Sequence, residues 1–276
     1  MLGICFSEST PAESPHSEQF IPRKRLPCRL GTGKVVCDHD RVGLDIYVGS
    51  LTRHLVGDWE LVAQKAAREM GLELNVVRKH DPEDAIRDPE QIRPVVLAWR
   101  EGLSHALRES LTEPLDWNEN QEAPYFTDKP TWDCYADLML WAAYDEQPEL
   151  SRPSHHVEQW SEDPAYKACT ADSFGSRYSH LYDVELWLPN SFGLVFKTED
   201  VGGNPVLVGS SVALFRQLED LNRRTWQAGK DLVEKWAFDG SENGAPLEPG
   251  ARFAFALFLK LARHSIEQKL PMRLDW

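Results

Sequence analysis

The pattern of apolar and polar positions is clearest between Pro130 and Pro148, where it predicts a helix over residues 131–146. Thr131 is suited to cap the first turn, and the two prolines limit the length of the helix. At about 100° per residue, one broad face of this segment is apolar, and we expect that face to enter a core. The opposite face carries carboxylates and aromatic rings, namely Asp133, Asp137, Trp141, Tyr144 and Asp145.

The first part of the chain alternates between strand and helix patterns. Residues 44–48 are typical of a short strand, residues 58–70 of a helix, and residues 72–77 of a second strand. This order predicts a β-α-β unit, whose two strands are parallel by default. A longer helix is expected over residues 90–111, and a long acidic and aromatic loop follows it.

Three strand patterns follow in the C-terminal half, over residues 183–188, 192–197 and 205–208. The short turns between them predict an antiparallel meander. Helix patterns then cover residues 211–226, 230–238 and 251–267. The last is apolar almost all round, so it is expected to be packed on several sides. The predicted fold class is therefore α+β, with a β-α-β unit, a mostly helical acidic middle and a C-terminal meander packed with helices.

The first 41 residues differ from the rest of the chain. Ser, Pro, Glu and basic residues dominate there, and no hydrophobic period appears. This composition predicts a disordered extension over residues 1–41 and a single globular domain over residues 42–276. Because the folded pattern begins abruptly, an alternative is that Val42 is the misread GTG start codon of a bacterial gene and that the native protein begins there.

Charge is concentrated in the middle of the chain. The net charge is -14, and residues 113–163 hold thirteen Asp and Glu but only Lys129 and Arg152 as basic residues. This segment repels phosphate backbones, so we expect no nucleic acid partner, and it attracts a basic protein or a cation.

The remaining composition favours a cytoplasmic protein without a cofactor. The five cysteines are scattered and form no CxxC pair, so neither a disulfide framework nor a zinc ribbon is indicated. We expect no membrane span and no signal peptide, because long apolar runs are absent. No stretch matches a catalytic signature, and we predict no bound cofactor.

The leading hypothesis is a non-enzymatic interaction protein whose acidic and aromatic surface binds and neutralises a basic protein partner. Charge would speed association, and aromatic anchors would supply most of the affinity. Trp141 has two interpretations: it is an exposed anchor, or it is a core residue covered by a neighbouring loop. The predicted partner-binding residues are Asp137, Trp141, Tyr144, Asp145, Trp117 and Tyr125.

Two alternatives stay open. One is a metal-dependent hydrolase, in which Asp133 and Asp137 at helical spacing join a histidine, His155 or His156. The other is a small-molecule binding protein with a pocket between the β-α-β unit and the meander. Polar residues of the first loop lie at the expected carboxyl end of its strand and are candidates to line a site there, namely Arg53, His54 and Asp58.

Three stretches carry a resemblance to other proteins. They are Gly43-Leu44-Asp45-Ile46-Tyr47-Val48-Gly49, Tyr125-Phe126-Thr127-Asp128-Lys129-Pro130 and Val184-Glu185-Leu186-Trp187-Leu188-Pro189. With these stretches, the chain from about Val42 onward resembles a group of bacterial hypothetical proteins. In size and acidity it also resembles immunity proteins that neutralise bacterial toxins. That likeness implies a basic toxin as partner and transfers no functional residues.

Overall fold

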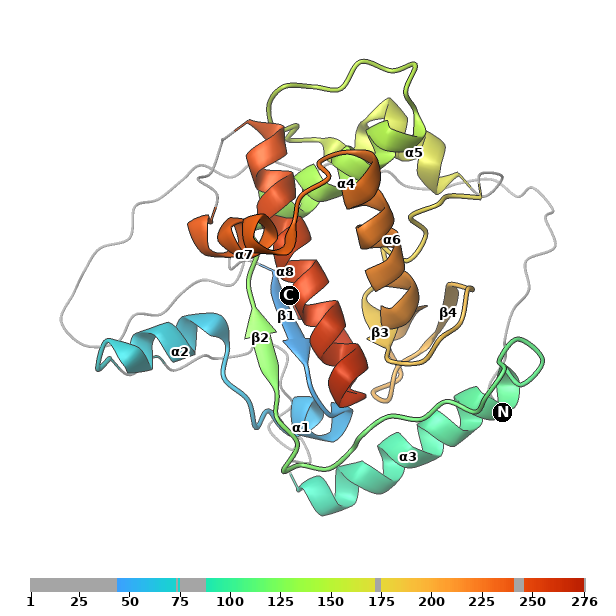
Figure 1. Ribbon diagram of the computed structural model, residues 1–276. Helices are drawn as coiled ribbons and strands as arrows, with labels where there is room; N and C mark the ends of the chain where they lie inside the picture. Colours follow the sequence, from blue (N-terminus) through green and yellow to red (C-terminus); the bar gives the residue numbers. More distant parts are fainter. Residues whose placement is uncertain (1–43, 73, 75–87, 172–174, 241–245, 276) are drawn as a thin grey trace, which may run out of the picture.

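The computed structural model describes residues 44–72, 74, 88–171, 175–240 and 246–275 (Figure 1). The predicted extension over residues 1–41 and the alternative start at Val42 lie outside these residues. The described helices are α1 (Leu51–Val56), α2 (Val62–Glu69), α3 (Pro89–Ala106), α4 (Trp132–Glu146), the short 3-10 helix η2 (Trp160–Glu162), α5 (Pro164–Thr170), α6 (Ser211–Arg224), α7 (Lys230–Asp239) and α8 (Leu247–Gln268). The described strands are β1 (Asp45–Val48), β2 (Phe126–Asp128), β3 (Leu186–Leu188), β4 (Phe196–Glu199), β5 (Pro205–Ser210) and β6 (Met272–Asp275).

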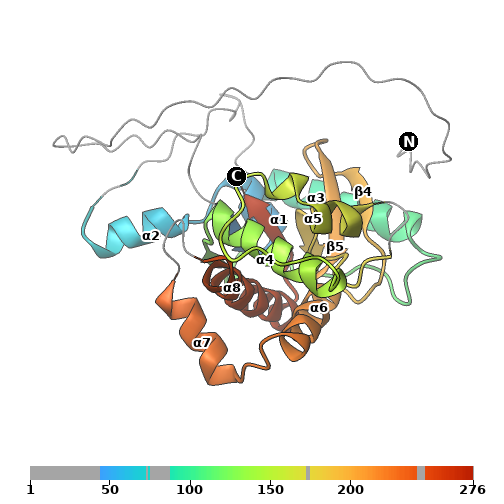
Figure 2. The same cartoon turned by 90° about the horizontal axis from the view of Figure 1, so that it is seen from above.

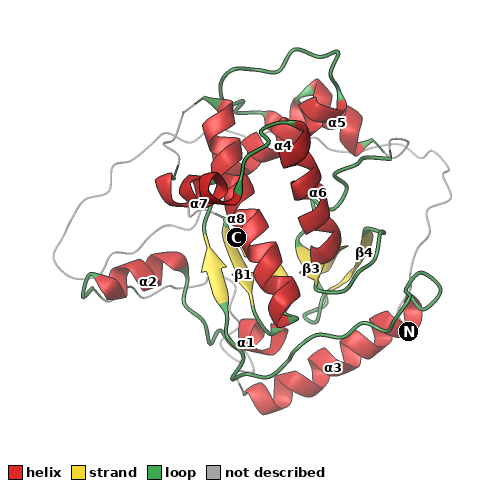
Figure 3. Cartoon of the chain, in the orientation of Figure 1, coloured by secondary structure: helices red, strands yellow, loops and turns green. Residues whose placement is uncertain are grey.

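The six described strands form one mixed sheet in the order β2-β1-β6-β3-β5-β4 (Figure 3). Only β3 and β5 run parallel, and all other neighbours are antiparallel. In β1, Ile46 lies opposite Asp128 on one side and Leu274 on the other. The protein thus combines one mixed, mainly antiparallel sheet with several helices. The predicted α+β class is confirmed.

The predicted parallel β-α-β unit is wrong. Both edges of β1 are occupied by antiparallel neighbours, β2 and β6, so a parallel strand from residues 72–77 has no place beside it. Of that segment, the described residues Leu72 and Leu74 are not in a strand, and the rest lies outside the described residues. The strands that pair with β1 come from distant parts of the sequence, and the local pattern around β1 does not indicate which strands they are.

The loop predicted after β1 contains a helix of its own. Ser50 Oγ accepts a hydrogen bond from the Arg53 backbone N–H at 3.2 Å, which caps α1, and Gly57 ends it with a φ of 75°. Glycine reaches this left-handed conformation without a Cβ clash. The next helix, α2, therefore begins at Val62 instead of at the predicted Asp58.

The predicted antiparallel meander is only partly formed. β4 and β5 make the expected hairpin, but β3 pairs with β5 in parallel, with Leu186 opposite Val208. The other edge of β3 is taken by β6, the C-terminal strand, which sits between β1 and β3 in the sheet. Met272 and Leu274 of β6 are buried there, so the chain end is a central strand of the sheet.

Helices cover both faces of the sheet and enclose two cores. Leu44, Ile46, Trp187 and Met272 pack with α4, α6 and α8 in the larger core. On the other face, Leu186 packs with apolar residues of α1 and α3. Figure 1 shows α8 and α6 side by side over one face and α3 along the far side of the molecule. Alternate strand residues thus serve opposite cores, as the two-residue period of a strand requires.

The predicted helices of the second half are confirmed. Thr131 Oγ1 accepts a hydrogen bond from the Cys134 backbone N–H, and Ser210 Oγ accepts one from that of Ala213, each at 3.1 Å. These are the N-caps of α4 and α6. The last helix, α8, is buried on several sides as expected, and it begins at Leu247, four residues before the predicted start.

No helix in the described part of the chain combines the length and the apolar character needed to cross a bilayer.

Candidate functional site

The central helix α4 is buried around most of its circumference. All residues from Cys134 to Tyr144 are buried, which includes Asp137, Trp141 and Tyr144 of the predicted partner-binding surface. Helices α5, α6 and α8 all contact α4. The prediction that these three side chains lie on an exposed face is therefore wrong, because the apolar stripe of α4 touches α8 while other elements close over its polar side.

Trp141 is 8% exposed. Its ring stacks on that of Trp226, with 5.2 Å between centroids and 17° between planes. The guanidinium carbon of Arg152, in the loop after α4, lies 3.8 Å from the Trp141 ring centroid. Such cation–π packing is favourable where water is excluded. The interpretation that a neighbouring loop covers Trp141 is confirmed, and the exposed-anchor interpretation is wrong.

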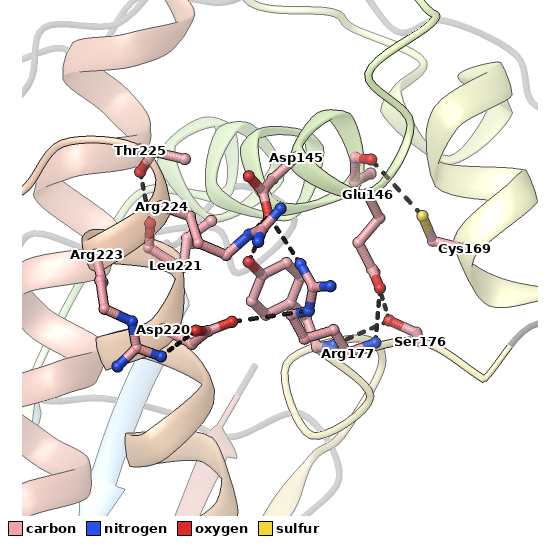
Figure 4. A network of polar contacts seen from close by, with 12 residues as sticks. Asp145, Glu146, Cys169, Ser176, Arg177, Asp220, Leu221, Arg223, Arg224 and Thr225 are labelled. Carbon is pink, nitrogen blue, oxygen red and sulfur yellow. Dashed lines mark hydrogen bonds and ion pairs between the residues drawn. The ribbon is translucent and has the colours of Figure 1, made fainter.

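Asp145 belongs to a partly exposed polar network that joins α4 to α6 and to residues 176–178 (Figure 4). Its Oδ2 accepts hydrogen bonds from the Tyr178 hydroxyl and from Arg224 Nε, each at 2.6 Å, and Arg177 Nη1 lies 3.6 Å away. Arg177 also forms an ion pair with Asp220 at 3.7 Å. The carboxylate is thus neutralised by cations of the same chain, and it is not presented to a basic partner.

The other predicted partner-binding residues lie apart from this network. The Tyr144 hydroxyl donates to Asp163 Oδ2 at 3.0 Å within the larger core region. Trp117 is buried in the opposite core, where its indole N–H donates to Glu119 Oε1 at 2.6 Å. Tyr125 packs near β1, with the Arg53 guanidinium carbon 5.2 Å from its ring centroid. The structure therefore does not bring the six predicted residues together on one surface.

The polar residues of the first loop also serve packing. Arg53 donates hydrogen bonds to the carbonyl oxygens of Gln121 and Ala123, which ties the acidic loop to α1. His54 Nε2 lies 3.4 Å from Asp275 Oδ1. The hollow beside His54, between α1 and the strands of the C-terminal half, measures about 10 Å³. That is about the space of one water molecule, so the described residues form no ligand-sized pocket beside His54.

Three side chains of the metal hypothesis do converge. His156 Nδ1 lies 2.8 Å from Asp137 Oδ1, and His156 Nε2 lies 3.5 Å from Asp133 Oδ1. The imidazole therefore lies between the two carboxylates. Burial raises the pKa of Asp137 to about 6, although the hydrogen bond from His156 acts in the opposite direction. The fourth candidate, His155, contacts Ser154 Oγ at 2.8 Å instead.

This arrangement is a set of histidine–carboxylate contacts and not a ligand cage. Metal ligands direct their lone pairs at one common point. Here both ring nitrogens of His156 face carboxylates, which fills the positions that a cation would take. Among the residues that the structure describes, no group of three or more His, Cys, Asp and Glu side chains is arranged to hold a metal ion.

A hollow of about 850 Å³ lies between α6, α7 and α8, and we call it the three-helix cleft. This volume lies within the range of roughly 300–1,000 Å³ that is typical of ligand pockets. Figure 2 shows α7 set off from the sheet, with α8 and α6 beside it. The apolar lining consists of Ala228, Val233, Ala237, Phe238, Phe255, Ala256 and Leu259. The polar lining consists of Glu219, Asn222, Arg223, Lys230, Glu234, Lys260, Arg263 and His264.

Helix α7 forms the outer wall of the three-helix cleft and packs on the rest of the protein through one side only. None of its residues is buried, Leu232 is 46% exposed, and Phe238 at the cleft is 90% exposed. Its anchor is Trp236, whose ring contacts those of Trp226 and Phe255 at centroid distances of 5.5 and 6.3 Å. The sequence predicted this helix but not the cleft. One residue could have indicated the cleft: Phe238 is apolar but lies outside the apolar stripe of this amphipathic helix.

Strand β2 positions the polar side of the cleft. The Phe126 ring stacks on His264, with 4.0 Å between centroids and 1° between planes. Lys260 Nζ forms an ion pair with Asp128 Oδ2 at 2.9 Å. Both contacts come from the stretch 125–130, so this segment, which lies far from α8 in the sequence, orients two residues of the cleft.

A second hollow, of about 590 Å³, lies along α3. One helix and the residues Pro114 and Leu115 form its walls. No aromatic side chain of the described residues lines it, and its described lining holds one cation, Arg100, and one acid, Glu101. The three-helix cleft is therefore the better candidate for a functional site.

Comparison of the chain with family models, with curated proteins and with solved structures gives no match. The resemblance to bacterial hypothetical proteins and to immunity proteins stays a prediction, so function must be inferred from the geometry of the three-helix cleft.

Proposed function

We propose that the protein is a small-molecule binding protein whose three-helix cleft takes an apolar or amphipathic ligand. The observation that carries this proposal is the shape and lining of the cleft, about 850 Å³ walled by three helices. Leu259, which is 8% exposed, borders the hollow from α8 beside the fully buried Phe255, and Phe238 supplies an exposed aromatic ring from α7. An exposed aromatic ring beside an apolar hollow gains free energy when a ligand removes both from water.

A neutralising interaction with a basic protein is the weaker candidate. Its proposed anchors, Asp137, Trp141 and Tyr144, are buried, and Asp145 is paired with arginines of the same chain. Anchors of protein interfaces must be accessible in the free protein, at least in part.

Titration with Nile red, a neutral apolar dye, tests the proposal. Dye fluorescence is expected to rise on binding and to saturate with one site per chain. Ala237→Trp fills the cleft from α7, where Ala237 is half-buried and lines the hollow, so this variant should bind the dye at least about tenfold more weakly. Ala98→Trp is the matched control, because Ala98 is exposed and lines the groove along α3.

Thermal unfolding of both variants shows whether they fold. Equal dye binding by wild type and a folded Ala237→Trp variant would contradict the proposal. Loss of dye binding in Ala98→Trp alone would move the site to α3 and contradict it as well.

A further inference from the structure

The three-helix cleft is cationic within an acidic protein. Its lining holds the four cations Arg223, Lys230, Lys260 and Arg263 against the two acids Glu219 and Glu234, whereas the whole chain carries -14. A local excess of one sign in a hollow with apolar walls focuses the field on its contents, because apolar walls screen charge poorly. The cleft therefore selects its ligand by charge as well as by shape.

Most of these cations are already paired. Lys230 lies 3.6 Å from Glu234, Lys260 lies 2.9 Å from Asp128, and Arg223 pairs with Asp220. Arg263 is different: its guanidinium carbon lies 5.6 Å from the Phe215 ring centroid, and no carboxylate of the described residues lies within ion-pair distance of it. Arg263 is thus, among the described residues, the cation of the cleft that can take an external anion.

The cations of α8 share one side of the helix with its apolar lining. Lys260, Arg263 and His264 are spaced three and four residues apart, and Leu259 and Ala256 precede them on the same side. Burial and the positive charges of Lys260 and Arg263 lower the pKa of His264. Glu267 and Asp128 act in the opposite direction. The lowered pKa of His264 favours the neutral imidazole, so the positive charge of this part of α8 is that of Lys260 and Arg263.

We propose that the ligand of the three-helix cleft is an amphiphile with an extended apolar chain and a single carboxylate head group. Arg263 binds the carboxylate through its guanidinium N–H groups, which match the two oxygens in a bidentate contact. The apolar chain lies against Leu259 of α8 and Val233 of α7, and Phe238 contacts it from the end of α7. This inference rests on the proposed function, because it names the ligand class of the same cleft.

Three ten-carbon probes test the ligand class by calorimetric titration at pH 7, below their micelle concentrations. They are decanoate, decyltrimethylammonium and 1-decanol, and the decanol is kept below its solubility limit because it forms no micelles. We expect decanoate to bind about tenfold more tightly than decanol, which is the change that one charge-assisted hydrogen bond produces, and the cation to bind most weakly. Arg263→Gln should remove this preference and leave the affinity for decanol unchanged. Arg216→Gln, an exposed arginine of α6 outside the cleft lining, is the matched control.

The outcomes separate the two proposals. Equal affinity for decanoate and decanol, tightest binding of the cation, or an unchanged preference in a folded Arg263→Gln variant would overturn the ligand class while the binding function stands. Binding of Nile red without binding of any ten-carbon probe overturns the ligand class in the same way. Absence of binding for all three probes and for Nile red overturns the proposed function itself.

Discussion

Helices α4 and α7 were both predicted as helices with an apolar and a polar side, but they have opposite surroundings. α4 has eleven consecutive buried residues, whereas α7 has none. The carboxylates of α4 pair with histidine and arginines of the same chain, as Asp137 does with His156. α7 contacts mainly α8 and leaves the three-helix cleft beside it. The acidic and aromatic residues of α4 are thus explained by packing, whereas α7, in which the sequence indicated no site residue, borders the candidate site.

The largest effect is expected from Trp141→Ala in α4. Loss of a buried indole between Trp226 and Arg152 should lower the free energy of unfolding by about 3–5 kcal/mol. Urea unfolding followed by circular dichroism measures it. The matched control is Trp132→Ala in the same helix, whose side chain is 39% exposed, and it should cost clearly less. A loss below about 1 kcal/mol in Trp141→Ala would restore the view of Trp141 as a binding anchor.

The second-largest loss of stability is expected from Asp145→Asn. This change removes the charge that Arg224 and Tyr178 bind, so the free energy of unfolding should fall by about 2 kcal/mol. Because the arginines are partly exposed, the loss should be smaller than for a fully buried pair. Glu149→Gln, an exposed acid of the same segment, should change the stability by less than about 0.5 kcal/mol. Equal values for the two variants would show that the network in Figure 4 contributes nothing to stability.

Asp137 should make the stability depend on pH. Its pKa is about 6 in the folded protein, above the value of about 4 for an unfolded aspartate. Between these values the folded state binds more protons than the unfolded state, so this carboxyl lowers the stability as pH rises from about 4 to 6. Asp137→Asn removes the ionisation. Relative to wild type, the variant should therefore gain on the order of 1–3 kcal/mol between pH 4 and pH 7. Parallel urea titrations at these two pH values measure the free energies of unfolding. If the difference between variant and wild type is the same at both pH values, Asp137 does not have a raised pKa in the folded protein.

The smallest effect on stability is expected from Phe238→Ala in α7. The side chain is 90% exposed, so the free energy of unfolding should change by less than about 0.5 kcal/mol. The affinity for Nile red should nevertheless fall about threefold or more, because the ring covers the cleft. Leu232→Ala, on the same helix but outside the cleft lining, should leave dye binding unchanged. The same loss of affinity in both variants would show that Phe238 has no specific role at the cleft.

Local elements such as α4, α6 and α8 could be predicted from the sequence. Thr131 and Ser210 cap α4 and α6 as their residue types and positions indicate, because capping involves neighbours within three residues. The apolar character of α8 predicted its burial on several sides. The covering of Trp141 by a loop was among the expectations, but Arg152 and Trp226 as its partners were not.

Which elements pack against each other could not be predicted from local patterns. The insertion of β6 between β1 and β3, the parallel pairing of β3 with β5, and the cleft between α6, α7 and α8 all join residues that are far apart in the sequence. Charge patterning along the chain pointed to the acidic middle, yet folding pairs Asp145 of that segment with arginines of the same chain and gathers Lys260 and Arg263 at an apolar hollow. A local pattern reports whether a side chain favours water or a core, and the long-range packing of the chain fixes which neighbour it meets there.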